Sequence, residues 1–135
     1  MAAILNNTLR GPATDLELVT PAGTLRGLRW GIPGNMPVLA LHGWLDNAAS
    51  FAQLGPLLEN SDIVAIDLPG HGCSDHRPPG SRYHFVDYIP AVLDAMTALA
   101  WPKCVLLGHS LGAAIATFTA AVEPNRVQGL FLIDG

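Results

Sequence analysis

The chain has 135 residues, of which 50% are hydrophobic and only 13% are charged, and its formal net charge is −4. This composition excludes a disordered protein, and the acidic balance argues against a nucleic-acid-binding protein, which would carry a basic surface. No apolar run reaches the ~18 residues of a membrane span, and residues 1–7 lack the features of a signal peptide. The chain has only two cysteines, which suits a reducing compartment. We therefore expect a cytoplasmic protein.

The first expected elements are two β-strands, at residues 15–20 and 24–30. Apolar and polar residues alternate along both segments, and residues 21–23, with the sequence PAG, supply a turn between them. Alternation of this kind indicates strands with one solvated face. We therefore expect an antiparallel pair at the edge of a sheet.

The rest of the chain alternates between apolar runs and segments of helix length. The apolar runs are short and continuous, which is typical of parallel strands buried on both faces; they lie at residues 38–41, 63–66, 105–107 and 130–133. The helix-length segments lie at residues 48–58, 85–99 and 111–122. This order predicts one α/β domain over residues 1–135, with a mostly parallel sheet and helices on both faces.

The last apolar run is followed by only two residues and no helix. A parallel strand at this position needs a neighbouring strand and a cover, because it otherwise exposes unpaired backbone groups. We therefore expect these 135 residues to be the front part of a larger α/β domain, incomplete at its C-terminal end. A homodimer that pairs this edge with a second copy is a further expectation.

The strongest chemical signal is the G-x-S-x-G pattern of residues 108–112, with the sequence GHSLG. It lies directly between an apolar strand and a helix rich in small residues, which is the context of a nucleophile elbow. In such a turn Ser110 holds a strained backbone conformation, and Gly108 and Gly112 avoid collisions with the neighbouring chain. We predict that Ser110 is a nucleophile; the alternative is a glycine-rich turn with an incidental serine.

A second signal, His42-Gly43-Trp44, ends the first fully buried strand. The backbone N–H of Trp44 and that of Leu111 are expected to form an oxyanion hole, in which each donor stabilises the transition state by about 2.7–4 kcal/mol. The alternative for the Trp44 ring is simple packing under a loop. His42 is expected to be a hydrogen-bonded structural histidine rather than a base.

A third segment, residues 67–75 with the sequence DLPGHGCSD, is similar to a dinucleotide-binding loop only in part. Asp75 stands where that loop needs its third glycine, and no helix follows directly. We expect a tight surface turn. The sequence contains no cofactor motif and no cluster of metal ligands, and neither Cys73 nor Cys104 needs a catalytic role.

Together these motifs resemble the α/β-hydrolase fold superfamily over nearly the whole chain. The resemblance rests on residues 42–44, 67–74 and 108–112, which follow the order of the family. Residues 42–48, with residues 50 and 51, look most like the serine hydrolase-like proteins. The resemblance implies hydrolysis or acyl transfer by Ser110, with a histidine as base and an acid that orients it. Members of the family place these residues in the order serine, acid, histidine.

The catalytic base is not among the histidines of this chain if that order holds. All five precede Ser110: His42, His71, His76, His84 and His109. Asp134, which ends the last strand, is a candidate for the acid, although a role in capping the loop is the expected one. The base and the usual acid are therefore expected beyond residue 135.

The residue type of the nucleophile narrows the substrate. Relatives that open epoxides or displace halide use a carboxylate at this position, whereas a serine needs a base and suits acyl substrates. We expect a small-molecule carboxylic ester, thioester or related acyl compound, and no cofactor. Two alternatives remain: a non-catalytic relative that binds a ligand or a partner, and an inactive product of truncation.

Overall fold

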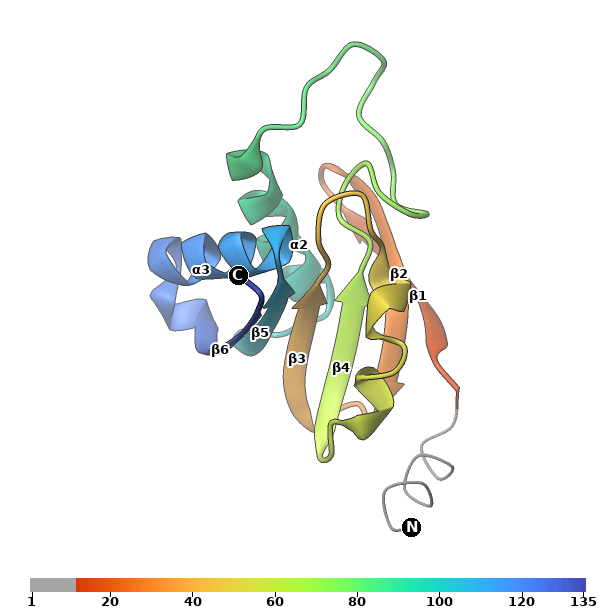
Figure 1. Cartoon of the computed structure of the whole chain (residues 1–135), viewed down its shortest axis with the longest axis vertical. Coiled ribbons are helices and arrows are strands. Elements are labelled where there is room, and N and C mark those ends of the chain that lie inside the picture. Colours follow the sequence, from red (N-terminus) through yellow and green to blue (C-terminus); the bar gives the residue numbers. More distant parts are fainter. Residues whose placement is uncertain (1–11) are drawn as a thin grey trace.

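The computed structural model describes residues 12–135, which form one six-stranded sheet with helices packed against it (Figure 1). The strands follow each other in space in the order β1-β2-β4-β3-β5-β6. Their bounds are β1 (Thr14–Thr20), β2 (Gly23–Gly31), β3 (Met36–Leu41), β4 (Ser61–Ile66), β5 (Cys104–His109) and β6 (Val127–Ile133). Each strand predicted from the sequence falls within one of these elements.

The sheet is mixed, as expected. Strand β1 pairs with β2 and β2 pairs with β4 in antiparallel register, whereas β4, β3, β5 and β6 are mutually parallel. The predicted antiparallel pair at a sheet edge is confirmed. The α/β fold class is confirmed with it, because parallel strands joined by helical connections make up the rest of the sheet.

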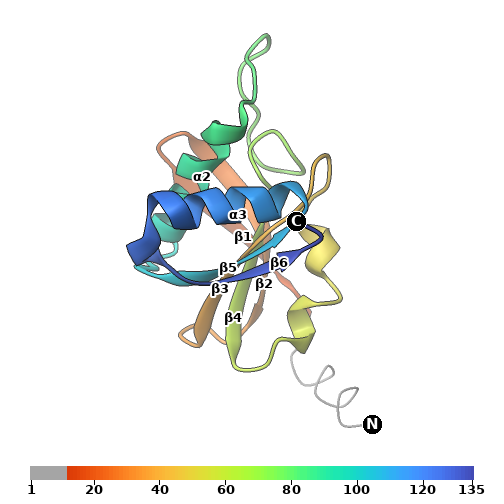
Figure 2. The same ribbon diagram turned by 60° about the vertical axis from the view of Figure 1, so that its left-hand side comes forward.

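Two α-helices cover one face of the sheet: α2 (Tyr88–Ala98), which continues a short 3₁₀ turn η3 (Phe85–Asp87), and α3 (Leu111–Val122). Figure 2 shows α3 lying across the parallel strands with α2 beside it. Val92 and Met96 of α2 and Ile115 of α3 join Leu39 and Leu106 of the sheet in one buried cluster. Among the described residues, no helix is long and apolar enough to cross a membrane.

The predicted helix over residues 48–58 is wrong. The segment forms two 3₁₀ turns, η1 (Ala48–Phe51) and η2 (Gly55–Leu57), which cover the second face of the sheet. A Cβ atom at Gly55 would lie 2.7 Å from the Trp30 ring, so the glycine lets η2 pack directly on that ring. Pro56 follows at the start of η2 and has no N–H for a continuing helix.

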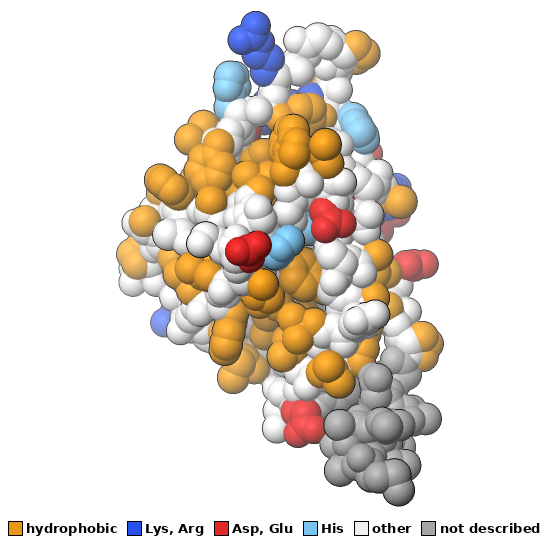
Figure 3. Space-filling model, viewed as in Figure 1, with side chains coloured by type: hydrophobic (Ala, Val, Ile, Leu, Met, Phe, Trp, Pro, Cys, Tyr) orange, Lys and Arg blue, Asp and Glu red, His pale blue; other side chains and the backbone are white. Residues whose placement is uncertain are grey.

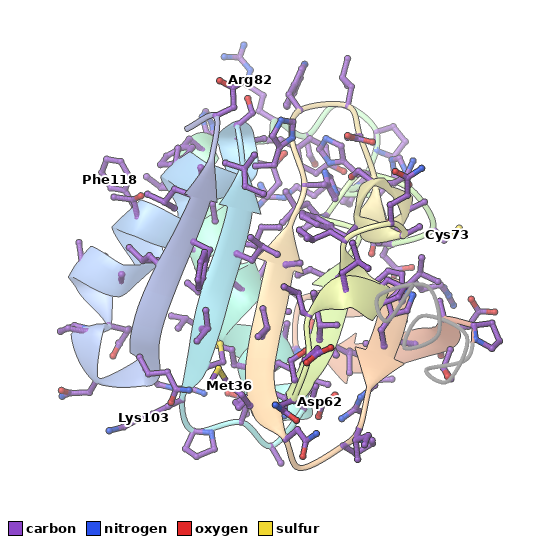
Figure 4. All side chains as sticks on the ribbon, turned by 60° about the horizontal axis from the view of Figure 1, so that its bottom comes forward. Met36, Asp62, Cys73, Arg82, Lys103 and Phe118 are labelled. Carbon is purple, nitrogen blue, oxygen red and sulfur yellow. The ribbon has the colours of Figure 1, made fainter. Side chains whose placement is uncertain are left out.

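Residues 130–133 are not covered on both faces by the described residues, in line with the expectation that the fold is incomplete at this end and that the last strand lacks a neighbour and a cover. Strand β6 pairs only with β5 among the described strands, and Phe131 is 68% exposed. Figure 4 shows Phe118 projecting outward from α3, and Figure 3 shows broad hydrophobic patches on the face seen in Figure 1. The apolar run therefore reflects a strand whose outer edge and faces remain open in this part of the chain.

The loops at the carboxyl ends of the strands gather at one end of the molecule. Figure 4 places Met36, Asp62 and Lys103 at the amino ends of β3, β4 and β5, and Arg82 beyond the opposite end. The long loop between β4 and η3 extends from that opposite end (Figure 1). Ligands of open α/β sheets bind outside the carboxyl ends of the strands, and all three sequence motifs lie there.

Candidate active site

The segments that follow β3 and β5 meet at the carboxyl end of the sheet, because these two strands are neighbours in parallel register. A Cβ atom at Gly43 would lie 3.5 Å from the Ser110 Cβ and 3.3 Å from the Nδ1 of His109. The two motifs that lie far apart in the sequence are therefore in direct contact. Trp44 follows Gly43 directly in the chain.

Ser110 occupies the sharp turn between β5 and α3. Its φ of 53° and ψ of −112° lie in a region that residues other than glycine rarely adopt. Its N–H donates to the carbonyl of Ile133 over 3.1 Å, and its carbonyl accepts from the N–H of Ala113 over 2.9 Å. Hydrogen bonds to β6 and α3 thus hold the strained conformation and leave the side chain exposed.

The glycines on either side of Ser110 are required by close backbone packing. A Cβ atom at Gly112 would overlap the carbonyl oxygen of Leu41 and lie 2.8 Å from that of His42. A Cβ atom at Gly108 would lie 2.6 Å from the Cα of Ala113. The first turn of α3 is therefore pressed against the ends of β3 and β5, as the G-x-S-x-G pattern predicts.

The two backbone N–H groups predicted to form an oxyanion hole are free to bind a ligand. Within residues 12–135, neither the Trp44 N–H nor the Leu111 N–H has a hydrogen-bond acceptor. Leu111 is the first residue of α3, where the helix dipole also favours negative charge. Their joint action on an oxyanion stays a prediction.

His42 is a buried structural residue. Its Nδ1–H donates to the carbonyl of Gly43 over 2.7 Å, and its Nε2 accepts from the N–H of Leu68 over 2.9 Å. Burial lowers the pKa of His42 below its ordinary value, because the charged form is poorly solvated there. With both ring nitrogens occupied, His42 does not serve as a base toward Ser110.

The segment after β4 is held by the carboxylate of Asp67. This group accepts from the N–H of Ala48 over 2.7 Å and from that of Cys73 over 2.9 Å. The hydroxyl of Ser74 donates to the Asp67 carbonyl and accepts from the N–H of Arg26 over 2.8 Å. The segment is the tight turn that the sequence predicts, and its polar residues bind neighbouring loops.

The other histidines also make no hydrogen bond to Ser110 within the described residues. His109 lies against Gly43, His76 and His84 are exposed on the loop that leads to α2, and His71 is buried. Its Nδ1 lies 3.1 Å from the carbonyl oxygen of Pro69. That none of these histidines is the catalytic base stays a prediction.

Asp134 lies beside the elbow but is not joined to Ser110 by a hydrogen bond among the described contacts. It follows Ile133, whose carbonyl accepts from the Ser110 N–H, and it has a positive φ of 50°. Its carboxylate is exposed. The structure places Asp134 near the site, and its role as the acid stays a prediction.

Sequence reasoning missed one residue of this region, Tyr88 at the start of α2. Its ring lies 6.3 Å from the ring of His71, which in turn lies 5.6 Å from that of Trp44, edge to face. No motif marks a tyrosine in this position, because the contact arises only when α2 packs beside the turn after β4. In the described part of the chain, no three His, Cys, Asp or Glu side chains are grouped as a metal site.

A strand–turn–helix serine beside a second, glycine-containing turn defines a class of protein, and comparison with known families agrees. The chain belongs to the alpha/beta hydrolase fold family, which matches residues 36–135. It is 43% identical to a serine hydrolase-like protein of Danio rerio over 94% of this chain. It is 38% identical to a serine hydrolase-like protein of Homo sapiens over 95% of this chain.

A solved structure supports the same assignment. A hypothetical protein from Pseudomonas aeruginosa is 44% identical and superimposes with a TM-score of 0.86, covering 90% of this chain and 43% of the other. The present chain spans 39% of the Danio rerio relative and 64% of the human one. Its likeness is therefore to the N-terminal part of longer proteins of this family.

Proposed function

We propose that the protein is a serine hydrolase in which Ser110 attacks the carbonyl carbon of a small-molecule acyl substrate. The observation that carries the proposal is the strained turn of Ser110, which packs against Gly43. A Cβ atom built at Gly43 would lie 3.5 Å from the Ser110 Cβ. Backbone strain of this kind persists at functional sites because the surrounding structure holds it in place. The name of the relatives, serine hydrolase-like proteins, supports the same chemistry.

In the proposed reaction the Ser110 oxygen bonds to the carbonyl carbon while a histidine accepts the hydroxyl proton. The carbonyl oxygen becomes an oxyanion, which the N–H groups of Trp44 and Leu111 stabilise by hydrogen bonds. Collapse of this intermediate expels an alcohol or thiol, which takes the proton from the histidine, and leaves an acyl-serine. Water then attacks the acyl carbon and releases the acid.

The histidine is proposed to come from a part of the protein outside these 135 residues. His42 has both ring nitrogens engaged, and no other histidine of the described chain hydrogen-bonds to Ser110. The greater length of the Danio rerio relative leaves room for later strands and for the residue that acts as base. An acid in that part, or Asp134, would orient the imidazole.

A fluorophosphonate probe tests the proposal in the complete protein. We expect the probe to label Ser110, and Ser110→Ala to abolish labelling and lower ester turnover by a factor of about 10⁴ or more. Ser81→Ala is the matched control, because Ser81 is exposed on the loop before α2, outside the three motifs, and should leave both readouts unchanged. Wild-type protein that neither reacts with the probe nor hydrolyses esters would contradict the proposal.

The second candidate function is a non-catalytic protein of this family that binds a ligand or a partner. It is favoured by the absence of any histidine hydrogen-bonded to Ser110 among the described residues. Such a protein would bind an acyl compound without turnover, and Ser110→Ala would change affinity but no rate. An inactive truncation product would instead fail to give a cooperative unfolding transition.

A further inference from the structure

Two buried polar atoms on neighbouring rings have no hydrogen-bond partner among the described residues. They are the Nε2 of His71 and the phenol oxygen of Tyr88. His71 is only 7% exposed and Tyr88 only 3%. Buried polar groups are almost always hydrogen-bonded, because an unpaired group has lost its water without replacement. Two such atoms on neighbouring rings indicate a site that accommodates one further polar group.

The His71 ring lies beside His42 and Trp44, and the Tyr88 ring lies beside His71. The His71 ring lies 6.3 Å from the Tyr88 ring, 5.6 Å from the Trp44 ring and 5.0 Å from the His42 ring. His42 and Trp44 flank Gly43, which packs against the side chain of Ser110. The ring of His71 is therefore next to the segment that is proposed to bind the oxyanion, and the ring of Tyr88 is one neighbour further away.

The chemistry of the two atoms is complementary. The Nδ1 of His71 lies 3.1 Å from the carbonyl oxygen of Pro69, and since that oxygen only accepts, Nδ1 carries the hydrogen. In the neutral ring this leaves Nε2 as an acceptor. Tyr88 supplies a donor, because burial raises the pKa of its phenol and keeps it protonated. A group that donates to Nε2 and accepts from the phenol is an O–H group.

We propose that His71 and Tyr88 form a binding site for a single hydroxyl group. The hydroxyl is supplied either by an ordered water molecule or by an alcohol group of the acyl substrate, which offer the same donor and acceptor. The site itself does not depend on catalysis. Only its use by a substrate hydroxyl rests on the proposed function.

The first test measures the His71 ring by ¹⁵N NMR in the complete protein at neutral pH. We expect the Nε2 resonance at the position of a hydrogen-bonded acceptor nitrogen, and a shift toward the position of an unbonded nitrogen in Tyr88→Phe. We also expect Tyr88→Phe to lower the melting temperature by about 2 °C or more, as the loss of a hydrogen bond does. Tyr83→Phe is the matched control. The Tyr83 phenol accepts from the N–H of Arg77, so this substitution should leave the His71 resonance unchanged.

The second test distinguishes the sources of the hydroxyl by comparing p-nitrophenyl 3-hydroxybutyrate with p-nitrophenyl butyrate. If the substrate supplies it, wild type prefers the hydroxy ester in kcat/KM, and Tyr88→Phe lowers this preference by about tenfold or more. If water supplies the hydroxyl, the hydrogen-bonded Nε2 resonance is present without ester, and Tyr88→Phe leaves the preference for the hydroxy ester unchanged. Either source of the hydroxyl supports the site.

The proposal is overturned if Nε2 resonates as an unbonded nitrogen with and without the hydroxy ester and Tyr88→Phe is at least as stable as wild type. If the Tyr88 phenol has no hydrogen-bond partner, Tyr88→Phe is at least as stable as wild type, because the substitution removes an unsatisfied buried group. Absence of all ester turnover would contradict the proposed function but not the site, since neither the resonance nor the stability depends on turnover.

Discussion

At the scale of single residues, Ser110 combines a sequence signal with a backbone conformation that costs stability. Its φ of 53° is in the left-handed region, and strain of this kind is of order 1–3 kcal/mol per residue. The hydrogen bonds to Ile133 and Ala113 oppose its relaxation. The strain therefore gives a property that can be measured without knowing the substrate.

We predict that Ser110→Gly is more stable than Ser110→Ala by about 1 kcal/mol, because glycine tolerates the conformation and alanine does not. Urea denaturation of the two variants of the complete protein measures the difference. Ala114→Gly in the first turns of α3 is the control and should instead lose about 1 kcal/mol relative to wild type. Equal or lower stability of Ser110→Gly relative to Ser110→Ala would contradict a strained elbow.

His42 gives a prediction on pH dependence. Burial lowers its pKa in the folded protein below the ordinary value of 6.5, so the unfolded chain binds the proton more readily. The neutral residue therefore contributes stability above pH 6.5, and this contribution is lost as the pH falls from 6.5 toward the folded pKa. We expect wild type to lose more stability than His42→Asn between pH 7 and about pH 5. Parallel pH profiles of the two proteins in chemical denaturation would refute this account.

At the scale of elements, a bidentate ion pair fastens β2 to β4 near the amino end of the parallel strands. The guanidinium of Arg29 donates to both carboxylate oxygens of Asp62, over 2.8 and 2.6 Å. The Asp62 side chain is 1% exposed and that of Arg29 is 26% exposed. The hydrogen bond to Asp62 raises the pKa of Arg29, so the guanidinium remains charged.

We predict that Asp62→Asn lowers the free energy of unfolding by about 2–3 kcal/mol, somewhat less than for a fully buried pair because Arg29 reaches solvent. The matched control is Glu17→Gln, which removes the exposed pair of Glu17 with Arg26 and should cost about 0.5 kcal/mol or less. Thermal or chemical denaturation of both variants measures the ratio. Similar losses in the two variants would show that the Asp62 pair does not hold the sheet.

The segment between β3 and β4 shows how elements can depart from their pattern. Its length and apolar content suit a helix, yet η1 and η2 are separate 3₁₀ turns. The side chain of Asn47 accepts from the N–H of Ala49, and the carboxylate of Asp67 accepts from that of Ala48. These hydrogen bonds start the turn, and Gly55 and Pro56 end the helical path against Trp30.

At the scale of the whole molecule, the two edges of the sheet differ in the apolar surface that they expose to solvent. The β1–β2 edge alternates apolar and polar residues, whereas β6 exposes four consecutive apolar residues, from 130 to 133. Exposed apolar patches of this kind mark surfaces that contact other protein. Together with the greater length of the relatives, this edge supports the proposal that further strands of the same fold complete the sheet.

The sequence by itself determined the strand order along the chain, the α/β class and the place of Ser110. These follow from local causes: two-residue alternation, continuous apolar runs, and a G-x-S-x-G pattern placed between an apolar strand and a helix. The site could be predicted as far as backbone N–H groups and one hydroxyl. Helix α3 was predicted with its observed ends, Leu111 and Val122.

Only the tertiary structure decided which residues meet. The contact of Gly43 with Ser110 depends on β3 and β5 becoming neighbours, and the pairing of His71 with Tyr88 depends on α2 packing beside the turn after β4. The exposure of β6 likewise depends on which other segments pack against it, whereas the break in the 48–58 segment had a local signal in Gly55 and Pro56. The spacing of apolar residues indicates which face of a segment is buried, whereas tertiary packing decides which other residues that face contacts.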